Sequence, residues 1–357
     1  MIYYLVNREY SNTMTSFLSS WGRNLKSIIE VIPYEKIFTR RFLLPGTYIF
    51  ADIERLNPAD AELAAIIWDA LRSRWGEEII ILNHPTRSMR RFELLRNLYE
   101  TGINFHNVYM LTNGEMPERY PVFLRNSNDH GGATSSLLYS LKELKDIIAR
   151  MDDQGKSRED KLIVEFCNTS DADGLFKKKS SFFINGRIIH RHIFCGKNWQ
   201  LKKPEIINLP MIKDELAFIE SHEHEMALKE IFNLARIDYG RIDYGIKDGK
   251  VQVWEINTNP GVAGLVRSSV QDRREEVHRA FVVQVEEAFT HIENITGIVG
   301  RIENPACEIT GSRKRKKLKK RFKRAFRDSF MPFMARSRSY VRLQFGELEK
   351  HLFTGKK

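Results

Sequence analysis

The stretch Arg241-Ile-Asp-Tyr-Gly-Ile-Lys-Asp-Gly-Lys-Val-Gln-Val-Trp-Glu-Ile-Asn-Thr-Asn-Pro-Gly261 reads as two β-strands joined by a tight turn. In a strand, side chains two positions apart share a face. Arg241 and Asp243 therefore share a face of the first strand. Glu255 and Asn257 share a face of the second strand. The stretch predicts a β-hairpin that carries acidic and amide groups at strand period.

The turn decides which side chains face each other across this hairpin. A two-residue turn at Asp248-Gly249 would set Asp243 opposite Trp254. A three-residue loop instead sets Asp243 opposite Glu255. We expect this second register, because it gathers a patch of oxygen ligands at Asp243, Glu255 and Asn257. Such ligands suit a hard cation such as Mg2+.

An ordinary hairpin with a solvated acidic face is the alternative. Two features favour the metal site. The acids are embedded among Val, Trp and Ile, where an unpaired carboxylate is costly to desolvate. The chain then runs into a tight polar turn, Asn257-Thr-Asn-Pro-Gly261. Asp243 followed by Trp254-Glu-Ile-Asn-Thr-Asn-Pro-Gly261 resembles the metal-binding end of the ATP-grasp superfamily.

The composition is that of a globular protein large enough for two or three lobes. The chain has 357 residues, of which 42% are hydrophobic and 11% aromatic. Its apolar runs are shorter than a membrane span, and residues 1–9 lack the basic-then-apolar order of a signal peptide. We therefore expect a cytoplasmic location. The three cysteines, Cys167, Cys195 and Cys307, fit neither a CxxC site nor a disulfide framework.

The net charge of +11 comes from one segment. Residues 311–327 hold eleven cations and no acid, so the rest of the chain has a net charge of zero (11 − 11 = 0). A solvated extension is one interpretation. However, Leu318, Phe322, Ala325 and Phe326 fall at helical spacing and predict a narrow apolar stripe among cations. That pattern favours peripheral attachment to an anionic membrane surface or a polyanion. It does not favour sequence-specific nucleic-acid binding, because no base-reading motif accompanies it.

The first 82 residues alternate strand-like and helical runs. The predicted strands are 2–6, 47–51 and 79–82, and the predicted helices are 14–21 and 58–75. Asn57-Pro58 is an N-cap followed by a proline at the first helical position. This alternation predicts a small α/β lobe with a largely parallel sheet.

Two further segments resemble ATP-grasp proteins. The first is a proline-containing loop and a helix that ends at Gly102; the family lysine that contacts nucleotide phosphates matches Arg91 here. The second is a strand followed by a loop with Gly131 and Gly132, which resembles the flexible phosphate-covering loop. A simple hairpin turn is the alternative for this loop. A second family lysine matches Arg125, and arginine keeps the charge and can bind phosphate bidentately.

A buried strand that ends at Cys167 resembles the ATP-grasp hinge, where adenine lies in an apolar slot. The resemblance implies that Glu165, Phe166 and Cys167 line this slot. It also implies that Asp173 or Asp171 contacts the ribose. Turn formation is an equally good reason for these two acids.

Asn185-Gly186 predicts a second hairpin. Its returning strand places Arg191 where family members often have a basic phosphate ligand, and we assign catalytic roles to Arg191 and Arg241 on this resemblance. His190 and His192 share a face and could bind a metal. We expect them to be solvated instead, because no third ligand is evident.

After the polar turn, residues 261–269 could line the pocket of a second substrate, with Arg267 and Ser268 as anion binders. Residues 213–236 predict an amphipathic helix, and residues 273–295 predict a closing helix.

The resemblance spans roughly residues 83–269 and implies an ATP-grasp architecture of the α/β class. In it, an N-terminal α/β lobe precedes two sheet-containing lobes that clamp ATP. The expected division is an N-terminal lobe at 1–82, a central lobe at 83–161, a C-terminal lobe with the metal site at 162–300, and a basic tail at 301–357.

The resemblance also implies an ATP-dependent ligase with two Mg2+ ions. It would activate a small-molecule or peptide carboxylate as an acylphosphate for attack by an amine, or by a thiol. Two alternatives stay open: an ATP-grasp kinase that phosphorylates an alcohol, and a non-catalytic protein that binds polyanions through its tail. The sequence identifies neither the carboxylate nor the nucleophile nor the oligomeric state.

Overall fold

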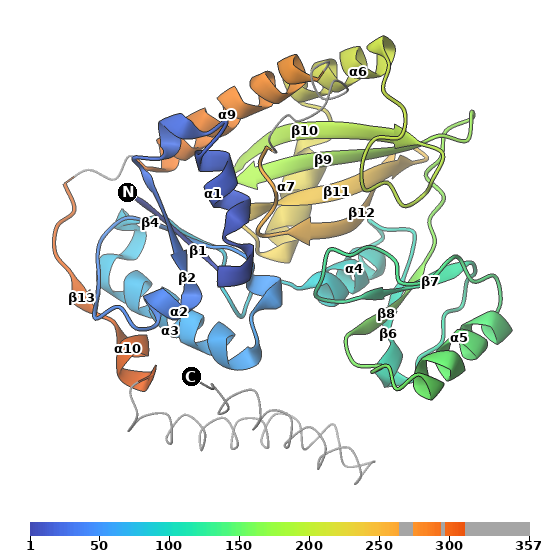
Figure 1. Ribbon diagram of the computed structural model, residues 1–357, viewed down its shortest axis with the longest axis horizontal. Coiled ribbons are helices and arrows are strands. Elements are labelled where there is room, and N and C mark those ends of the chain that lie inside the picture. The colour runs from blue at the N-terminus through green and yellow to red at the C-terminus, as the bar shows by residue number, and fades with distance from the viewer. Residues whose placement is uncertain (264–273, 294–296, 311–357) are drawn as a thin grey trace, which may run out of the picture.

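The computed structural model describes residues 1–263, 274–293 and 297–310 (Figure 1). Within these ranges the chain has a mixed α/β fold with three sheets of three or four strands and a two-stranded ribbon. The expected apolar stripe at 311–327 and the expected anion binders Arg267 and Ser268 lie outside the described residues. No helix in the described ranges is long and apolar enough to cross a membrane.

The N-lobe is a parallel sheet with helices on both faces. Its strands are β1 (Ile2–Val6), β2 (Ile29–Pro33), β4 (Thr47–Phe50) and β5 (Ile81–Leu82), in the order β2-β1-β4-β5. Every residue of β1 is buried, as expected for a strand covered on both faces. The predicted parallel α/β lobe is therefore confirmed, although β2 was not predicted.

Helices of the N-lobe follow from local signals. The largest, α3 (Pro58–Trp75), has the predicted bounds, and the Asn57 side chain accepts a hydrogen bond of 3.0 Å from the backbone N–H of Asp60. The other N-lobe helices are α1 (Asn12–Leu18) and α2 (Tyr34–Ile37). The described chain also has five short 3-10 helices: η1 (Arg8–Tyr10), η2 (Arg23–Leu25), η3 (Ile53–Arg55), η4 (Gly76–Glu78) and η5 (Leu111–Asn113).

The middle lobe is a small antiparallel sheet between two helices. Strands β6 (Val108–Met110), β7 (Val122–Asn126) and β8 (Lys161–Glu165) lie in the order β6-β8-β7. Helix α5 (Leu141–Asp153) packs on one face, and α4 (Arg91–Glu100) packs beside the other face. Because β8 pairs with both other strands, the expected boundary between 161 and 162 falls inside a strand of this lobe.

The C-lobe is a four-stranded antiparallel sheet. Its strands are β9 (Phe176–Ile184), β10 (Arg187–Gly196), β11 (Tyr239–Lys247) and β12 (Lys250–Asn257), in the order β10-β9-β11-β12. Its helices are α6 (Leu209–Glu220), α7 (Glu225–Ala235) and α9 (Glu275–Glu293). The single helix expected over 213–236 is two helices, because the chain breaks between α6 and α7 and His224 there has a φ of 61°.

The N-lobe and the C-lobe share one hydrophobic core. Tyr4 of β1 packs edge-on against Tyr239 of β11 with ring centroids 5.7 Å apart, and Tyr239 lies 6.1 Å from Phe289 of α9. The middle lobe has separate apolar clusters. Figure 1 shows it set below the C-lobe sheet.

The β11–β12 hairpin has the expected register, for a different reason. Asp243 pairs with Glu255, as predicted. The turn is nevertheless the two-residue Asp248-Gly249, with φ of 50° and 74°, so the predicted three-residue loop is wrong. The shift comes from a β-bulge in which Trp254 is the extra residue. Gly245 leaves room for it, because a Cβ there would lie 2.7 Å from the Trp254 ring.

The described end of the chain returns to the N-lobe. Strand β13 (Ile302–Glu303) pairs with β3 (Phe42–Leu43), and α10 (Pro305–Thr310) packs against α3. Ala306 of α10 is fully buried. The expected tail boundary at 301 is therefore too early, because residues 302–310 are part of the N-lobe packing.

Candidate active site

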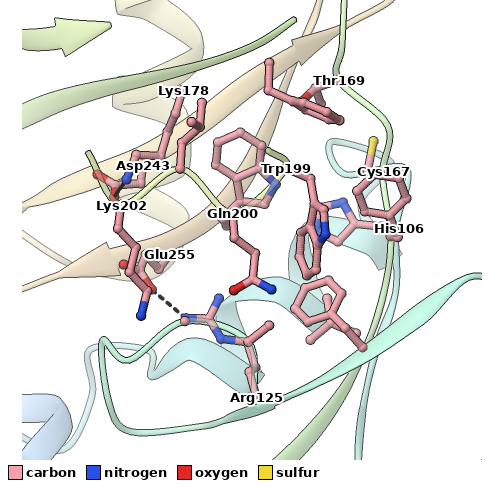
Figure 2. Close-up of a pocket in the computed structure, with 18 of the residues that line it drawn as sticks. His106, Arg125, Cys167, Thr169, Lys178, Trp199, Gln200, Lys202, Asp243 and Glu255 are labelled. Carbon is pink, nitrogen blue, oxygen red and sulfur yellow. Dashed lines mark hydrogen bonds and ion pairs between the residues drawn. The ribbon is translucent and has the colours of Figure 1, made fainter. Parts of the chain in front are cut away.

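A cavity lies between the middle lobe and the C-lobe. Its walls come from β7 and β8 on one side, from β9, β11 and β12 on the other, and from the segment 199–202 after β10. Figure 2 shows these side chains converging from both lobes on one space. Seven of the predicted site residues line it: Arg125, Gly132, Glu165, Phe166, Cys167, Asp243 and Glu255.

One end of the cavity is an aromatic slot. Phe123 and Trp199 lie with ring centroids 4.8 Å apart, and Phe166 meets Trp199 edge-on at 5.6 Å. Cys167 lines the same end, and burial raises the pKa of its thiol. The faces and edges of these rings that border the cavity can pack against a flat aromatic ligand.

Two residues predicted for the nucleotide have other local roles. The Glu165 side chain is buried and accepts hydrogen bonds from the Asn107 backbone N–H (2.9 Å), the Tyr109 hydroxyl (3.0 Å) and Arg119 (2.7 Å). It therefore holds the chain before β6 as well as lining the cavity. Asp173 is exposed on a turn and does not line the cavity.

The alternative ribose ligand, Asp171, is also a turn former. Its carboxylate accepts hydrogen bonds from the backbone N–H groups of Asp173 (3.1 Å) and Leu175 (3.0 Å). It does not line the cavity either.

Asp243 lies at the other end of the cavity among cations. It is 4% exposed and accepts hydrogen bonds from the Ser180 hydroxyl (2.7 Å), Lys178 Nζ (3.2 Å) and Arg241 Nε (2.9 Å). Burial alone would raise the pKa of this carboxyl, but Arg241 and Lys178 outweigh it and lower the pKa. Asp243 is therefore ionised at neutral pH.

Glu255 joins the two lobes. Its Oε2 accepts hydrogen bonds from Arg91 Nη2 at 2.6 Å and from Arg125 Nη2 at 2.7 Å. His130 Nδ1 lies 3.7 Å from its other oxygen. Burial would raise the pKa of Glu255, but Arg91, His130 and Arg125 hold it well below its ordinary value. Both arginines predicted to contact phosphates thus meet a predicted metal ligand.

Asn257, the third predicted metal ligand, shares the strand face of Glu255 but does not line the cavity. Its Oδ1 accepts a hydrogen bond of 2.8 Å from the Asn259 backbone N–H. Among the described residues, no group of three or more His, Cys, Asp or Glu side chains could hold a metal ion. The carboxylates of Asp243 and Glu255 nevertheless fit Mg2+, which proteins often bind through one or two carboxylates plus phosphate oxygens and water.

The two predicted catalytic arginines lie apart. Arg241 is beside Asp243, whereas Arg191 is buried, does not line the cavity, and donates to the Val262 carbonyl (3.0 Å). Burial and the neighbouring Arg274 lower the pKa of Arg191 to about 9. Arg241 does not line the cavity either, but it contacts Asp243, which does.

His190 and His192 are buried, so the expectation that they are solvated is wrong. His190 Nδ1 lies 2.8 Å from the Ser181 hydroxyl, and His192 stacks on Phe194 at 3.8 Å.

Sequence reasoning missed several residues of the site. Lys178, Trp199 and Lys202 line the cavity, and the Lys202 ammonium donates to the carbonyl of Gly131, which does not itself line it. Gly132 has a φ of 88°, and a Cβ there would lie 2.9 Å from Lys202 Cε. The alternation along β9 could have pointed to Lys178, which is two residues from Ser180 and on the face of Asp243. Nothing local to the sequence points to Trp199 or Lys202.

Comparisons with known proteins give structural matches only. No protein-family model matches the chain, and no curated protein matches it. Solved structures do. The structures that the chain is similar to include ATP-grasp ligases.

D-alanine–D-alanine ligase from Bacillus anthracis, complexed with ATP, is 15% identical; the match covers 83% of this chain and 100% of that one, with a TM-score of 0.46. D-alanine–D-alanine ligase from Coxiella burnetii is 11% identical over 82% and 96% of the two chains, with a TM-score of 0.46. The ATP-grasp ligase PsnB, complexed with a minimal precursor, is 13% identical over 82% and 98%, with a TM-score of 0.48. At these identities and TM-scores, we base the function on the residues of the cavity.

Proposed function

We propose that this chain is an ATP-grasp ligase that joins a carboxylate to an amine, or to a thiol, at the expense of ATP. One observation carries the proposal. Asp243 and Glu255 face each other on a bulged hairpin, and Glu255 meets Arg91 and Arg125 of the other lobe. This arrangement lies at one end of a cavity whose other end is aromatic.

The charges suit a magnesium nucleotide. Four cations, Arg91, Arg125, Lys178 and Arg241, surround two carboxylates, which leaves two positive charges in excess (4 − 2 = 2). A triphosphate supplies anionic oxygens for these cations. Once the arginines turn to phosphate, the two carboxylates need a new cation, and Mg2+ meets that need.

The aromatic end supports a nucleotide base. Phe123, Phe166 and Trp199 offer ring surface to a planar base beside the end of β8. We propose that adenine lies there, with Cys167 at its edge, and that the triphosphate runs from this slot toward Glu255. The glycine-containing loop with Gly132 would then cover the phosphates, since Gly132 lines the same cavity.

The reaction follows from this placement. A substrate carboxylate oxygen attacks the γ-phosphorus, the bond to the β-phosphate oxygen breaks, and ADP leaves an acylphosphate behind. The amine nitrogen or thiol sulfur then bonds to the acyl carbon, the bond from that carbon to the phosphate oxygen breaks, and inorganic phosphate leaves. The nucleophile loses one proton to the leaving phosphate or to water. Arg241 and Lys178 stabilise negative charge on the transferring group, and Arg91 and Arg125 hold the β- and γ-phosphates. When bound, Mg2+ held by Asp243 and Glu255 would offset triphosphate charge.

The proposal is tested first by nucleotide binding and then by turnover. Calorimetry should detect binding of ADP that is strengthened by Mg2+, and Asp243→Asn should weaken the Mg2+ effect. The matched control is Asp248→Asn, an exposed turn residue outside the cavity. Absence of nucleotide binding to the wild-type chain would contradict the proposal.

Turnover separates the ligase from its alternatives. ATP incubated with pools of small carboxylic acids, peptides and amines should yield ADP, inorganic phosphate and a product heavier by the amine less water. A phosphorylated alcohol without free phosphate would identify a kinase instead. Binding of polyanions without any nucleotide binding would identify the non-catalytic alternative.

A further inference from the structure

The loop that follows β7, residues 127–134, is contacted from three sides; we call it the glycine loop. Arg91 of α4 donates to the Ser127 carbonyl at 2.9 Å. Lys202 of the C-lobe donates to the Gly131 carbonyl. His130, in the loop itself, places Nε2 3.0 Å from Glu54 Oε1 of the N-lobe. All three lobes therefore contact this one loop.

The N-lobe contact ends on an anchored carboxylate. Glu54 lies in η3, directly after β4, and is 8% exposed. It accepts hydrogen bonds from the Thr258 hydroxyl and from the Thr258 backbone N–H at 3.3 Å, and Thr258 Oγ1 accepts one from the Ile53 backbone N–H at 3.1 Å. Glu54 is thus fixed to the polar turn after β12 and cannot follow the loop if the loop moves.

His130 lies between two carboxylates, of which one already accepts hydrogen bonds from two arginines. Glu54 is 3.0 Å from Nε2, whereas Glu255 is 3.7 Å from Nδ1 and already accepts from Arg91 and Arg125. In the proposed function, Glu255 turns to Mg2+ when the nucleotide binds. In the described chain, the other hydrogen bonds that Glu54 accepts come from Thr258, so Glu54 remains available to His130.

We propose that His130 is a positioning residue that fastens the glycine loop to the N-lobe through Glu54 and thereby holds the loop over bound phosphates. The inference rests on the proposed function, because it assigns a role to a residue of that site. Its consequence is that the N-lobe, and not only the two clamping lobes, sets how long a nucleotide stays bound. His130 and Glu54 are 76 residues apart in the chain, so this coupling is a property of the fold.

The experiment measures loop protection and nucleotide release in four variants. His130→Ala removes the contact, His130→Gln keeps an N–H donor for Glu54, and Glu54→Gln changes the partner; the double variant His130→Ala/Glu54→Gln completes the cycle. The probe for release is fluorescently labelled ADP with Mg2+. Hydrogen exchange of residues 127–134 is measured without nucleotide. His222→Ala, an exposed histidine, is the control.

The expected result is about tenfold faster ADP release and faster loop exchange in His130→Ala, since one hydrogen bond to a carboxylate is lost. His130→Gln should recover part of both effects, which loss of folding would not allow. The double variant should release ADP no faster than His130→Ala. Unchanged exchange of 127–134 in His130→Ala, or multiplicative effects in the double variant, would overturn the inference. If the wild-type protein does not bind ADP, the proposed function fails. Hydrogen exchange of residues 127–134 then still tests whether His130 fastens the glycine loop to Glu54.

Discussion

Replacing Glu255 with glutamine should have opposite effects on stability and on metal-free nucleotide binding. In the structure, one oxygen of Glu255 accepts hydrogen bonds from Arg91 and Arg125, which are 7% exposed each. Glutamine keeps the shape but removes the charge of the carboxylate that the two buried guanidinium groups share. Removing one partner of a buried ion pair costs about 3–5 kcal/mol. Because the Glu255 side chain is 13% exposed, we expect the lower end, about 3 kcal/mol.

The same change should help ATP bind in the absence of metal. In the wild-type chain, the phosphates must compete with Glu255 for both arginines. In Glu255→Gln the arginines are free to bind phosphate, so ATP with a chelator present should bind about tenfold more tightly or better, on the scale of one charge-assisted hydrogen bond. Mg2+-dependent turnover should fall steeply, because a metal ligand is lost.

Thermal unfolding and calorimetry, each with and without Mg2+, measure these effects. Glu287→Gln is the matched control, because Glu287 is exposed and pairs with Arg187 on the surface; its effect should stay within about 1 kcal/mol. Two results would refute the reasoning. One is a Glu255→Gln protein as stable as wild type, and the other is unchanged Mg2+-dependent ATP consumption.

Three further predictions test other parts of the molecule. Arg125→Ala should weaken ATP binding about tenfold or more, since a charged hydrogen bond to phosphate is lost; calorimetry measures it. Burial and then Glu54 raise the pKa of Asp52 from 3.8 to about 6, so the folded state keeps a proton that the unfolded state releases. Wild-type stability should therefore fall between about pH 4 and 6 relative to Asp52→Asn, by roughly 3 kcal/mol in denaturant unfolding. A chain that ends at Thr310 should keep ATP turnover but lose salt-sensitive binding to anionic vesicles or polyanions.

Each of these has a distinct contrary outcome. ATP affinity unchanged in Arg125→Ala would mean that this side chain stays on Glu255. A stability difference between wild type and Asp52→Asn that stays constant from pH 4 to 6 would mean that the Arg55 ion pair offsets burial. Loss of nucleotide binding on removal of the basic segment would mean that this segment packs on the catalytic lobes. A chain ending at Asn304 is a useful contrast, since it also loses α10, whose Ala306 is fully buried.

Features encoded by local periodicity and capping could be predicted from the sequence. The α3 helix has the predicted bounds because Asn57-Pro58 starts it. The parallel N-lobe strands are predicted by short apolar runs. The pairing of Asp243 with Glu255 was predicted as well, but its cause was not, because a bulge at Trp254 depends on the space that Gly245 leaves.

Features that depend on distant segments could not be predicted. The contact of Glu54 with His130 joins two lobes, and neither residue stands in a recognisable pattern. Likewise Trp199 lies in the irregular segment after β10, yet it is part of the aromatic slot. Glu165 and Asp173, in contrast, were predicted from the resemblance as nucleotide contacts, and the prediction did not foresee their local surroundings. A position inferred from a family pattern says nothing about which neighbours already engage the side chain.

The most direct test of the central claim is a crystal structure of the chain with a non-hydrolysable ATP analogue and Mn2+, whose anomalous signal locates the metal. We predict the base packed against the aromatic end formed by Phe123, Phe166 and Trp199. We predict the phosphates against Arg91 and Arg125, and a metal peak between the phosphates and the Asp243–Glu255 pair. A nucleotide bound elsewhere, or Glu255 still paired with both arginines while the analogue occupies the cavity, would contradict the proposed function.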